Sequence, residues 1–325
     1  MRKRSRLIKA VTALILLLLL ATLGLVPVLA DTQVETVATF DPLAGELPEG
    51  IAVDKVGTIY FSFDPLGEVW KISPGEPPSL FKAFGDAGAL GMAVDALGNV
   101  YVARETFNPD THGVWRIDRD GVAERLAGSE NIVYPNSLAF DKRGNIYVTD
   151  TILGAVWRIP PNGATELWLQ HDLLEGLNLP EIPIPFPLGA NGIAFRQGNL
   201  YVANTEKAHV VRIPVLGDGS AGEPQIVAEG PALFPLDGIA LDVHGNLYAL
   251  AIAQSTLLRI DPADGSMTTL ATADDGLDFP ASLAFGTGRS NRQSVFVTNF
   301  AIGPPGGAGP GILKIDVGMP GMPLP

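Results

Sequence analysis

Four oxygen-bearing side chains stand at the same position of a repeated sequence pattern. They lie two residues before the apolar run that opens a copy of the pattern, and they are Glu49, Asn136, Asn191 and Asp237. Two carboxylates and two amide carbonyls are hard oxygen donors, and the chain has no cysteine and no histidine at these positions. Such a set favours Ca²⁺ over Zn²⁺ or Cu²⁺, with another divalent cation as the alternative. Four protein oxygens underfill a calcium shell of about 6–8 ligands, so water or substrate oxygens must complete it.

A turn is the alternative explanation of this position, because Asn-Gly and Asp-Gly pairs are common in turns. Two observations argue against it. Leu90 and Ala281 occupy the same position in other copies, so the backbone there does not demand Asn or Asp. Glu49 is a poor turn former, yet it stands in the same register. We therefore interpret the four residues as ligands of one cation, which would be a Lewis acid suited to polarising a carbonyl or phosphoryl group.

The repeat that carries these residues predicts the fold. Residues 135–150 form its clearest copy, a strand, a tight turn and a second strand. The copies begin 41, 46, 55, 46 and 44 residues apart, as differences between the first residues of their apolar runs, which are Ile51, Met92, Leu138, Ile193, Ile239 and Leu283. A period in the forties with about four strands per unit is typical of a β-propeller. We predict an all-β, six-bladed propeller with four-stranded antiparallel blades.

The predicted propeller also brings the four oxygen donors together. The first strand of each blade lines the central channel, and its starting end faces one mouth of that channel. Residues at equal positions before the first strands must then form a ring around the axis. The donors, which are far apart in the sequence, therefore converge at one mouth.

Both ends of the predicted propeller need a separate explanation. The sixth unit lacks a fourth strand, because residues 318–325 are rich in Gly and Pro and cannot pair as a strand. Residues 32–40 have strand character, and we expect them to complete blade six and close the ring, which leaves no long exposed edge. The propeller would then span residues 31–316, followed by a flexible Pro/Gly tail over residues 317–325.

The first 30 residues carry the pattern of a secretory signal peptide. Basic residues at positions 2, 3, 4, 6 and 9 precede an uncharged apolar run over residues 10–26, and cleavage is expected after Ala30. The protein would then be exported to the periplasm, the cell surface or the medium. An uncleaved N-terminal anchor is the alternative, because the run is long for a signal although short for a full membrane span.

The charge of the mature chain limits its partners. Cleavage removes five basic residues from 22, which leaves 17 basic against 35 acidic residues and a formal net charge of −18. That charge disfavours nucleic acid and anionic membrane surfaces as partners. We expect a monomer that binds a small-molecule substrate and no membrane after cleavage. The absence of cysteine means that the fold depends on its core rather than on disulfides.

At these residues the chain resembles a known family of six-bladed propellers, the group of senescence marker protein, gluconolactonase and luciferin-regenerating enzyme. The resemblance covers the whole mature chain as a blade pattern and is specific at four points. The family's calcium ligands are a Glu in blade one, Asn in blades three and four and Asp in blade five, and they match Glu49, Asn136, Asn191 and Asp237. The resemblance implies the opening of lactones or phosphoesters by the metal and, in several members, by the residue at Asp237.

The chain departs from its relatives at two positions. Leu90 stands where paraoxonases, more distant relatives, carry a His proposed as the base. Tyr134 replaces a substrate-binding Arg of the sugar-lactonase branch, which argues against a sugar lactone as the substrate. The related NHL-repeat propellers share much of the blade pattern without this metal set, and many of them are binding modules.

Further candidate substrate contacts lie at the ends of second strands and in loops on the predicted metal side, and they are Arg104, Glu105, Asp150, Asn204, Asn299, His171 and Tyr134. His112 and His209 are further candidate bases beside that mouth. Two insertions, residues 173–188 and 303–311, gather there as well, and long loops on a rigid scaffold commonly carry specificity. Because the first insertion is apolar, we expect a substrate with an apolar part.

The sequence thus predicts an exported calcium-dependent hydrolase of lactones or related esters, in which Asp237 is a metal ligand and also the base or nucleophile. A non-catalytic, NHL-like binding propeller with a structural metal is the alternative. A lyase or synthase activity is a third hypothesis.

Overall fold

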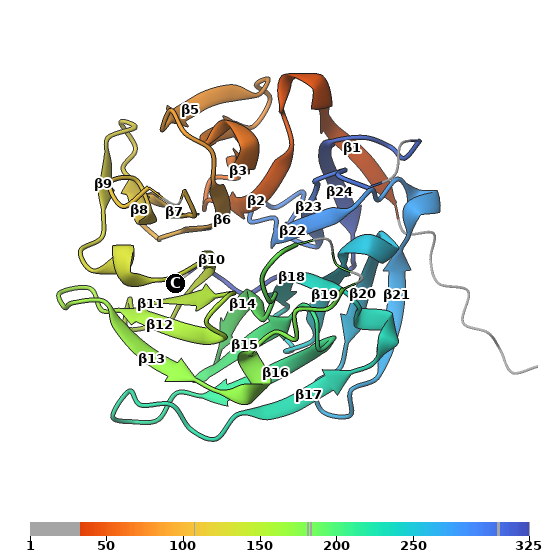
Figure 1. The fold of residues 1–325 in the computed structure, drawn as a ribbon. Helices are drawn as coiled ribbons and strands as arrows, with labels where there is room; N and C mark the ends of the chain where they lie inside the picture. Colours follow the sequence, from red (N-terminus) through yellow and green to blue (C-terminus); the bar gives the residue numbers. More distant parts are fainter. Residues whose placement is uncertain (1–32, 107, 181, 183, 304–305, 325) are drawn as a thin grey trace, which may run out of the picture. The chain divides into compact units, whose positions relative to one another are not determined.

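The computed structural model describes residues 33–106, 108–180, 182, 184–303 and 306–324. The strands of these residues form six four-stranded sheets arranged in a ring (Figure 1). Neighbouring strands within the sheets pair antiparallel, so the predicted six-bladed propeller is confirmed. The signal peptide expected over residues 1–30 lies outside the described residues. Among the residues that are described, no helix has the length and apolar character needed to cross a membrane.

Each blade begins with a first strand at the channel and continues outward strand by strand. Blade one contains β2 (Pro48–Val53), β3 (Ile59–Phe63), β4 (Glu68–Ile72) and β5 (Ser79–Ala83). Blade two contains β6 (Ala89–Val94), β7 (Val100–Arg104), β8 (Gly113–Ile117) and β9 (Ala123–Arg125). Blade three contains β10 (Pro135–Phe140), β11 (Ile146–Asp150), β12 (Ala155–Ile159) and β13 (Glu166–Gln170).

The remaining blades follow the same order. Blade four contains β14 (Ala190–Arg196), β15 (Asn199–Asn204), β16 (His209–Pro214) and β17 (Gln225–Glu229). Blade five contains β18 (Leu236–Leu241), β19 (Leu247–Ala251), β20 (Thr256–Ile260) and β21 (Met267–Ala271). Blade six contains β22 (Pro280–Phe285), β23 (Ser294–Asn299), β24 (Gly311–Asp316) and β1 (Val34–Thr39).

Short 3₁₀ turns occur in the connections, and in the described residues they are η1 (Pro42–Ala44), η2 (Asp64–Leu66), η3 (Ser129–Asn131), η4 (Asp172–Leu174), η5 (Pro231–Leu233), η6 (Ile252–Gln254) and η7 (Ala273–Asp275). All seven of these turns lie in connections that leave a second or a fourth strand. Because these connections border the cavity discussed below, the turns help to place its walls.

The N-terminal strand closes the ring. β1 pairs antiparallel with β24, from Val34 opposite Ile315 to Thr39 opposite Gly311, and Figure 1 shows the two strands side by side. The last blade is therefore built from both ends of the propeller, as the sequence predicted. Because β1 pairs with the outer edge of β24, blade six has four strands like the others and the ring is closed.

Apolar side chains fill the spaces between neighbouring blades. One cluster joins Ala103 and Val114 of blade two to Leu138 and Val148 of blade three, with the half-buried Trp157 packed against it. The alternation of apolar and polar residues along each strand supplies one such face to each neighbour. This packing fixes the positions of the first strands, and with them the residues that face the channel.

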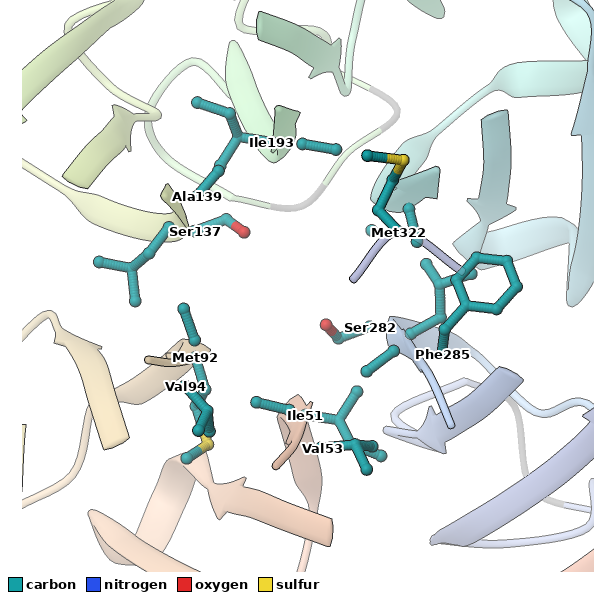
Figure 2. Close-up of a pocket in the computed structure, with 18 of the residues that line it drawn as sticks. Ile51, Val53, Met92, Val94, Ser137, Ala139, Ile193, Ser282, Phe285 and Met322 are labelled. Carbon is teal, nitrogen blue, oxygen red and sulfur yellow. The ribbon is translucent and has the colours of Figure 1, made fainter. Parts of the chain in front are cut away.

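The C-terminal segment lies across the end of the channel that is away from the ring of oxygen donors. The Val243 N–H donates to the Pro320 carbonyl at 3.0 Å, and the Met322 N–H donates to the Leu241 carbonyl at 3.1 Å. Met322 lines a cavity of about 220 Å³ together with first-strand side chains. Figure 2 shows that most of these side chains are apolar, among them Ile51 and Met92, and that Ser137 and Ser282 also belong to the lining. The sequence suggested a flexible tail here, but two backbone hydrogen bonds and an apolar contact hold residues 320–322 in place.

Candidate metal centre

Every first strand carries a β-bulge at the position where the sequence places the oxygen donors. In blade one, Pro48 pairs with Phe63 and Ile51 pairs with Phe61, so Glu49 and Gly50 together oppose the single residue Ser62. The other blades shift register at the same place. A bulge leaves one residue outside the ladder and turns its side chain away from the regular direction. The fold therefore uses an extra residue in each blade to direct one side chain at the mouth.

The glycines that follow the donors are required by packing. A Cβ atom on Gly50 would lie 2.2 Å from the Leu90 carbonyl oxygen, and one on Gly192 would lie 2.5 Å from the Asp237 carbonyl oxygen. Neither glycine is among the described residues with positive φ. The Glu-Gly, Asn-Gly and Asp-Gly pairs thus reflect the close approach of neighbouring first strands. This finding removes the main reason to interpret them as turns.

Hydroxyl groups on second strands tie the ring together. The Thr298 hydroxyl accepts a hydrogen bond from the Ser282 N–H at 3.0 Å and donates to the Glu49 carbonyl at 2.7 Å. Thr149 links Ser137 to the Asn191 carbonyl in the same way, with 2.7 Å to that carbonyl. In each case a bulge N–H of one blade is connected to the donor residue of the next blade. The hydroxyls therefore hold the backbone of Glu49 and Asn191 in place.

All six ring positions line one cavity of about 710 Å³, and they are Glu49, Leu90, Asn136, Asn191, Asp237 and Ala281. Their convergence was the central geometric expectation from the repeat. The structure brings the four predicted ligands together at one mouth, with Leu90 and Ala281 completing the ring. No Lys, Arg or His belongs to the described residues that line this cavity.

The electrostatics of the cavity favour a cation. Glu49 is only 8% exposed, and its Oε2 atom has no hydrogen-bond partner among the described residues. Burial, followed by the charges of Asp237 and Asp64, raises the pKa of Glu49 well above its usual range. Burial also raises the pKa of Asp237 to about 7, although a hydrogen bond from the Asn191 side chain opposes that shift. A buried and a half-buried carboxylate without a cationic partner among the described residues of the cavity must take up protons or bind a cation.

The Asn191 amide is oriented by the protein. Its Nδ2 atom donates to the Thr205 hydroxyl at 3.1 Å, and the side chain also hydrogen-bonds to Asp237. An amide nitrogen has two N–H groups, so these two acceptors match its capacity and leave the oxygen as the donor atom for a cation. The described residues hold no group of three or more His, Cys, Asp or Glu side chains with metal-binding geometry. The candidate site therefore depends on two carboxylates combined with two amides, a donor set that fits Ca²⁺.

Asp64 is a cavity residue that the sequence analysis missed. It begins η2, directly after the second strand of blade one, and lines the cavity with Glu49. Burial raises the pKa of Asp64 to about 6, opposed by a hydrogen bond from the Gly88 backbone. Residues at the equivalent position of other blades, Thr205, Ile252 and Phe300, line the same cavity. Alignment of the second-strand ends would have identified this second ring.

Tyr134 is the one predicted substrate contact that lines the cavity. Burial raises the pKa of its hydroxyl, and the charge of Glu105 adds to the shift. Its ring packs against Phe186 of the first insertion with 5.4 Å between centroids. Tyr134 therefore connects the ring of donors to the loop above it.

The other predicted contacts do not belong to the cavity lining, and they are Arg104, Glu105, Asp150, Asn204, Asn299 and His171. Arg104 is fully buried and forms an ion pair with Asp86 at 2.5 Å. Asp150 accepts hydrogen bonds from the Val133 N–H at 2.8 Å and from the Trp157 indole at 3.1 Å. These carboxylate and guanidinium groups brace the connections between blades, so the end of the second strand is a structural position.

The predicted amide and imidazole side chains at this mouth also bond to the backbone of nearby loops. Asn204 donates to the Leu173 and Glu175 carbonyls at 3.1 and 2.9 Å. His171 accepts from the Leu173 N–H at 3.1 Å and so caps η4. The rings of His112 and His209 contact the carbonyls of Ile132 and Leu173, respectively. These residues are polar because they form hydrogen bonds with loop backbones, and the sequence alone does not distinguish that role from substrate binding.

Comparisons with known proteins place this geometry in context. A β-propeller repeat family matches residues 123–149. A gluconolactonase from Xanthomonas campestris is 20% identical over 90% of this chain and 91% of its own, with a TM-score of 0.68. A luciferin-regenerating enzyme is 16% identical over 90% and 97% of the two chains, with a TM-score of 0.68.

A third solved structure is regucalcin, a calcium-binding protein from Agrobacterium tumefaciens. It is 16% identical over 89% of this chain and 96% of its own, with a TM-score of 0.65. No curated protein matches the chain in sequence. The chain is thus a six-bladed β-propeller with structural neighbours among gluconolactonases, luciferin-regenerating enzymes and regucalcins, as the sequence resemblance predicted.

Proposed function

We propose that this protein is an exported calcium-dependent hydrolase of lactones or related esters, with its reaction site in the cavity at the ring of oxygen donors. The observation that carries the proposal is the buried, unpartnered carboxylate of Glu49 close to the charges of Asp237 and Asp64. A stable protein does not leave such a group unpaired without a compensating cation or proton. The structural similarity to a gluconolactonase and to a calcium-binding regucalcin supports the same interpretation.

The protein's own residues have separate roles in this proposal. Glu49, Asn136 and Asn191 would hold the metal through side-chain oxygens, and bound Ca²⁺ would supply a Lewis acid for the carbonyl oxygen of the substrate. Asp237 would be a fourth ligand and would accept the proton of the attacking water. In the metal-free protein, burial raises the pKa of Asp237 to about 7.

A non-catalytic binding propeller with a structural metal is the second candidate. The observation that favours it is the lining itself, which offers carboxylates but no histidine, cysteine or serine among its described residues. Carboxylates alone can serve a metal without any turnover. The two candidates differ in one measurable property, the consumption of substrate by calcium-loaded protein.

A panel of lactones, carboxylic esters and phosphotriesters with and without a chelator tests the proposal. We expect hydrolysis of at least one lactone or ester by the calcium-loaded protein, loss of that activity in chelator, and recovery on adding calcium. An absence of turnover across the panel by protein with one bound metal would favour the binding candidate. Intact-mass measurement of exported protein tests the proposed cleavage after Ala30, and retention of residues 1–30 would favour the anchor.

A further inference from the structure

The cavity has two parts of opposite chemistry. The ring of donors forms a polar floor, whereas its walls above the floor are aliphatic and aromatic. Ile182, Ile184 and Leu188 come from the first insertion. Phe279 lies just before β22, and Ile302 lies in the connection between β23 and β24 of blade six. The first predicted insertion thus forms one side of the apolar wall, and Ile302 stands directly before the second, whose Gly303 also lines the cavity.

Two large aliphatic side chains of this wall are exposed. Ile184 is 38% exposed and Ile302 is 53% exposed, and both line the cavity. Single apolar residues scattered over a protein surface need no explanation, whereas apolar residues grouped at the mouth of a cavity are typical of a binding site. The exposed wall implies that part of the ligand is apolar.

The first insertion is fixed by a buried carboxylate. Glu206 is 4% exposed and accepts backbone hydrogen bonds from Leu177, from Asn178 at 2.7 Å and from Leu179 at 3.0 Å. Three consecutive N–H groups around one carboxylate hold the loop just before Ile182. The apolar wall on this side is therefore formed before a ligand arrives, which lowers the entropy cost of binding.

The second insertion is fixed in a similar way. The Asp278 carboxylate accepts a hydrogen bond from the Gly309 N–H at 2.8 Å, and the Asp278 carbonyl accepts one from the Ala301 N–H at 3.1 Å. These bonds bracket Ile302 and join its loop to the connection before β22. The two apolar segments are far apart in the sequence, and each is held by hydrogen bonds to a carboxylate.

The charge of the cavity selects against anions. Three carboxylates, those of Glu49, Asp64 and Asp237, line it without a cationic side chain among the described residues. One divalent cation neutralises two of the three, so one negative charge remains. A ligand with a carboxylate or phosphate on its free end would meet that charge in a site of low dielectric constant.

We propose that this site takes an uncharged lactone or ester whose apolar acyl or alkyl chain lies against Ile184 and Ile302, and that it discriminates against anionic analogues. The assignment of the reacting group rests on the proposed function. The assignment of an uncharged apolar chain rests on the wall and the charge of the cavity. Polyhydroxylated sugar lactones would leave their hydroxyl groups unpaired against this wall and would bind poorly.

Calorimetric binding of alkylcyclopentanones, in which a CH₂ group replaces the ring oxygen of a γ-lactone, tests this inference without hydrolysis. With calcium-loaded wild type we expect the affinity to rise about two- to fourfold per methylene over the first several carbons. The matched ketone that ends in a carboxylate is expected to bind at least about tenfold more weakly than the one that ends in a methyl group.

The variants Ile184→Ser and Ile302→Ser are expected to flatten the dependence on chain length. Both residues are exposed, so the fold should remain intact, and a melting curve checks this. Leu216→Ser is the matched control, because Leu216 is 46% exposed and belongs to a connection outside the cavity lining. It should leave the dependence unchanged.

An affinity independent of chain length, an unchanged slope in both isoleucine variants, or tighter binding of the carboxylate would overturn the inference. The outcomes separate it from the proposed function. Chain-dependent binding of the ketones without hydrolysis of any lactone would refute the hydrolase and retain the apolar site. Hydrolysis with equal kcat/KM for short and long chains would retain the hydrolase and refute the apolar site.

Discussion

The two ends of the central channel are built from the same six strands, yet their side chains have opposite chemistry. At one end, Glu49 and Asp237 are the second residues of β2 and β18 and face a cavity that contains three carboxylates. At the other end, Ile51 and Ile239 of the same strands line an apolar cavity closed by Met322 (Figure 2). Within β2 and β18, a single glycine separates the polar position from the apolar position.

This difference follows from the geometry of a strand. The bulge near the start of each first strand turns the donor side chain toward one mouth, whereas the regular part of the strand that follows supplies the apolar residues of the other cavity. The apolar positions pack against their neighbours and stabilise the fold, whereas the polar positions hold carboxylates in a cavity whose described lining has no cationic side chain, at a cost to stability. The carboxylates of the donor ring therefore lower the stability of the metal-free fold, and the same carboxylates are the groups that can bind a cation.

The largest expected effect is on the apolar end. Ile193→Asp places a carboxylate in the apolar cavity, where no ring of oxygen donors and no cation offsets its burial. We expect a loss of about 3–5 kcal/mol in the free energy of unfolding. Chemical denaturation measures it, with Ile193→Leu as the control at below about 1.5 kcal/mol. If Ile193→Asp were tolerated, the two ends would not differ as described.

Asp237→Asn at the polar end should lower activity and leave the stability of the metal-free protein unchanged or higher, in contrast to Ile193→Asp. The amide keeps one ligand oxygen but loses the negative charge and the capacity to accept a proton. We expect kcat to fall about a hundredfold or more while part of the calcium affinity remains. The metal-free variant should be no less stable than metal-free wild type. Full activity in this variant would show that Asp237 has no part in the reaction.

Thr298→Val tests how the ring is held. The substitution removes the hydroxyl that joins the Ser282 N–H to the Glu49 carbonyl and leaves both groups buried without that partner. We expect a loss of about 1–3 kcal/mol in stability and weaker calcium binding. Thr256→Val, at an exposed hydroxyl on the rim of blade five, is the control. Equal calcium affinity in Thr298→Val and wild type would mean that the hydroxyl only stabilises the fold.

The smallest expected effect is a pH dependence of the metal-free protein. Burial raises the pKa of Asp237 to about 7 and that of Glu49 well above its usual range, so the folded state binds protons more tightly than the unfolded state. Stability from these groups is therefore present at low pH and is lost as pH rises toward 7. We expect a higher Tm at pH 5.5 than at pH 7.5 without calcium, and a weaker dependence in Glu49→Gln with Asp237→Asn. An equal pH dependence in both proteins would assign it to other groups.

The sequence predicted the ring because the repeat fixes it. Once the copies align, Glu49, Asn136, Asn191 and Asp237 must meet, whatever the details of their loops. Asp64 was missed because it begins a 3₁₀ turn that has no counterpart in most blades. Arg104, Asp150 and Asn204 at the ends of second strands were predicted as substrate contacts, but they do not line the cavity.

Residues at the ends of second strands are polar because they bond to loop backbones, and a sequence shows their polarity but not their partners. Asp150, which accepts from several backbone and side-chain N–H groups, is the clearest case. The position of the C-terminal tail was not predictable either. Its backbone hydrogen bonds with Leu241 and Val243 hold this Gly- and Pro-rich segment in place, and no sequence pattern indicates them. Pairing within a repeat is predictable, whereas contacts made by irregular segments are not.

A calcium titration of the melting curve near neutral pH, combined with metal analysis of the purified protein, tests the central claim most directly. Because calcium would bind the folded state alone, we expect the Tm to rise with calcium and to fall in chelator, by the equivalent of about 2.7 kcal/mol at a hundredfold excess over Kd. Glu49→Gln with Asp237→Asn should remove most of this dependence without lowering the Tm of the metal-free protein. A flat titration of wild type with no bound metal would contradict the account.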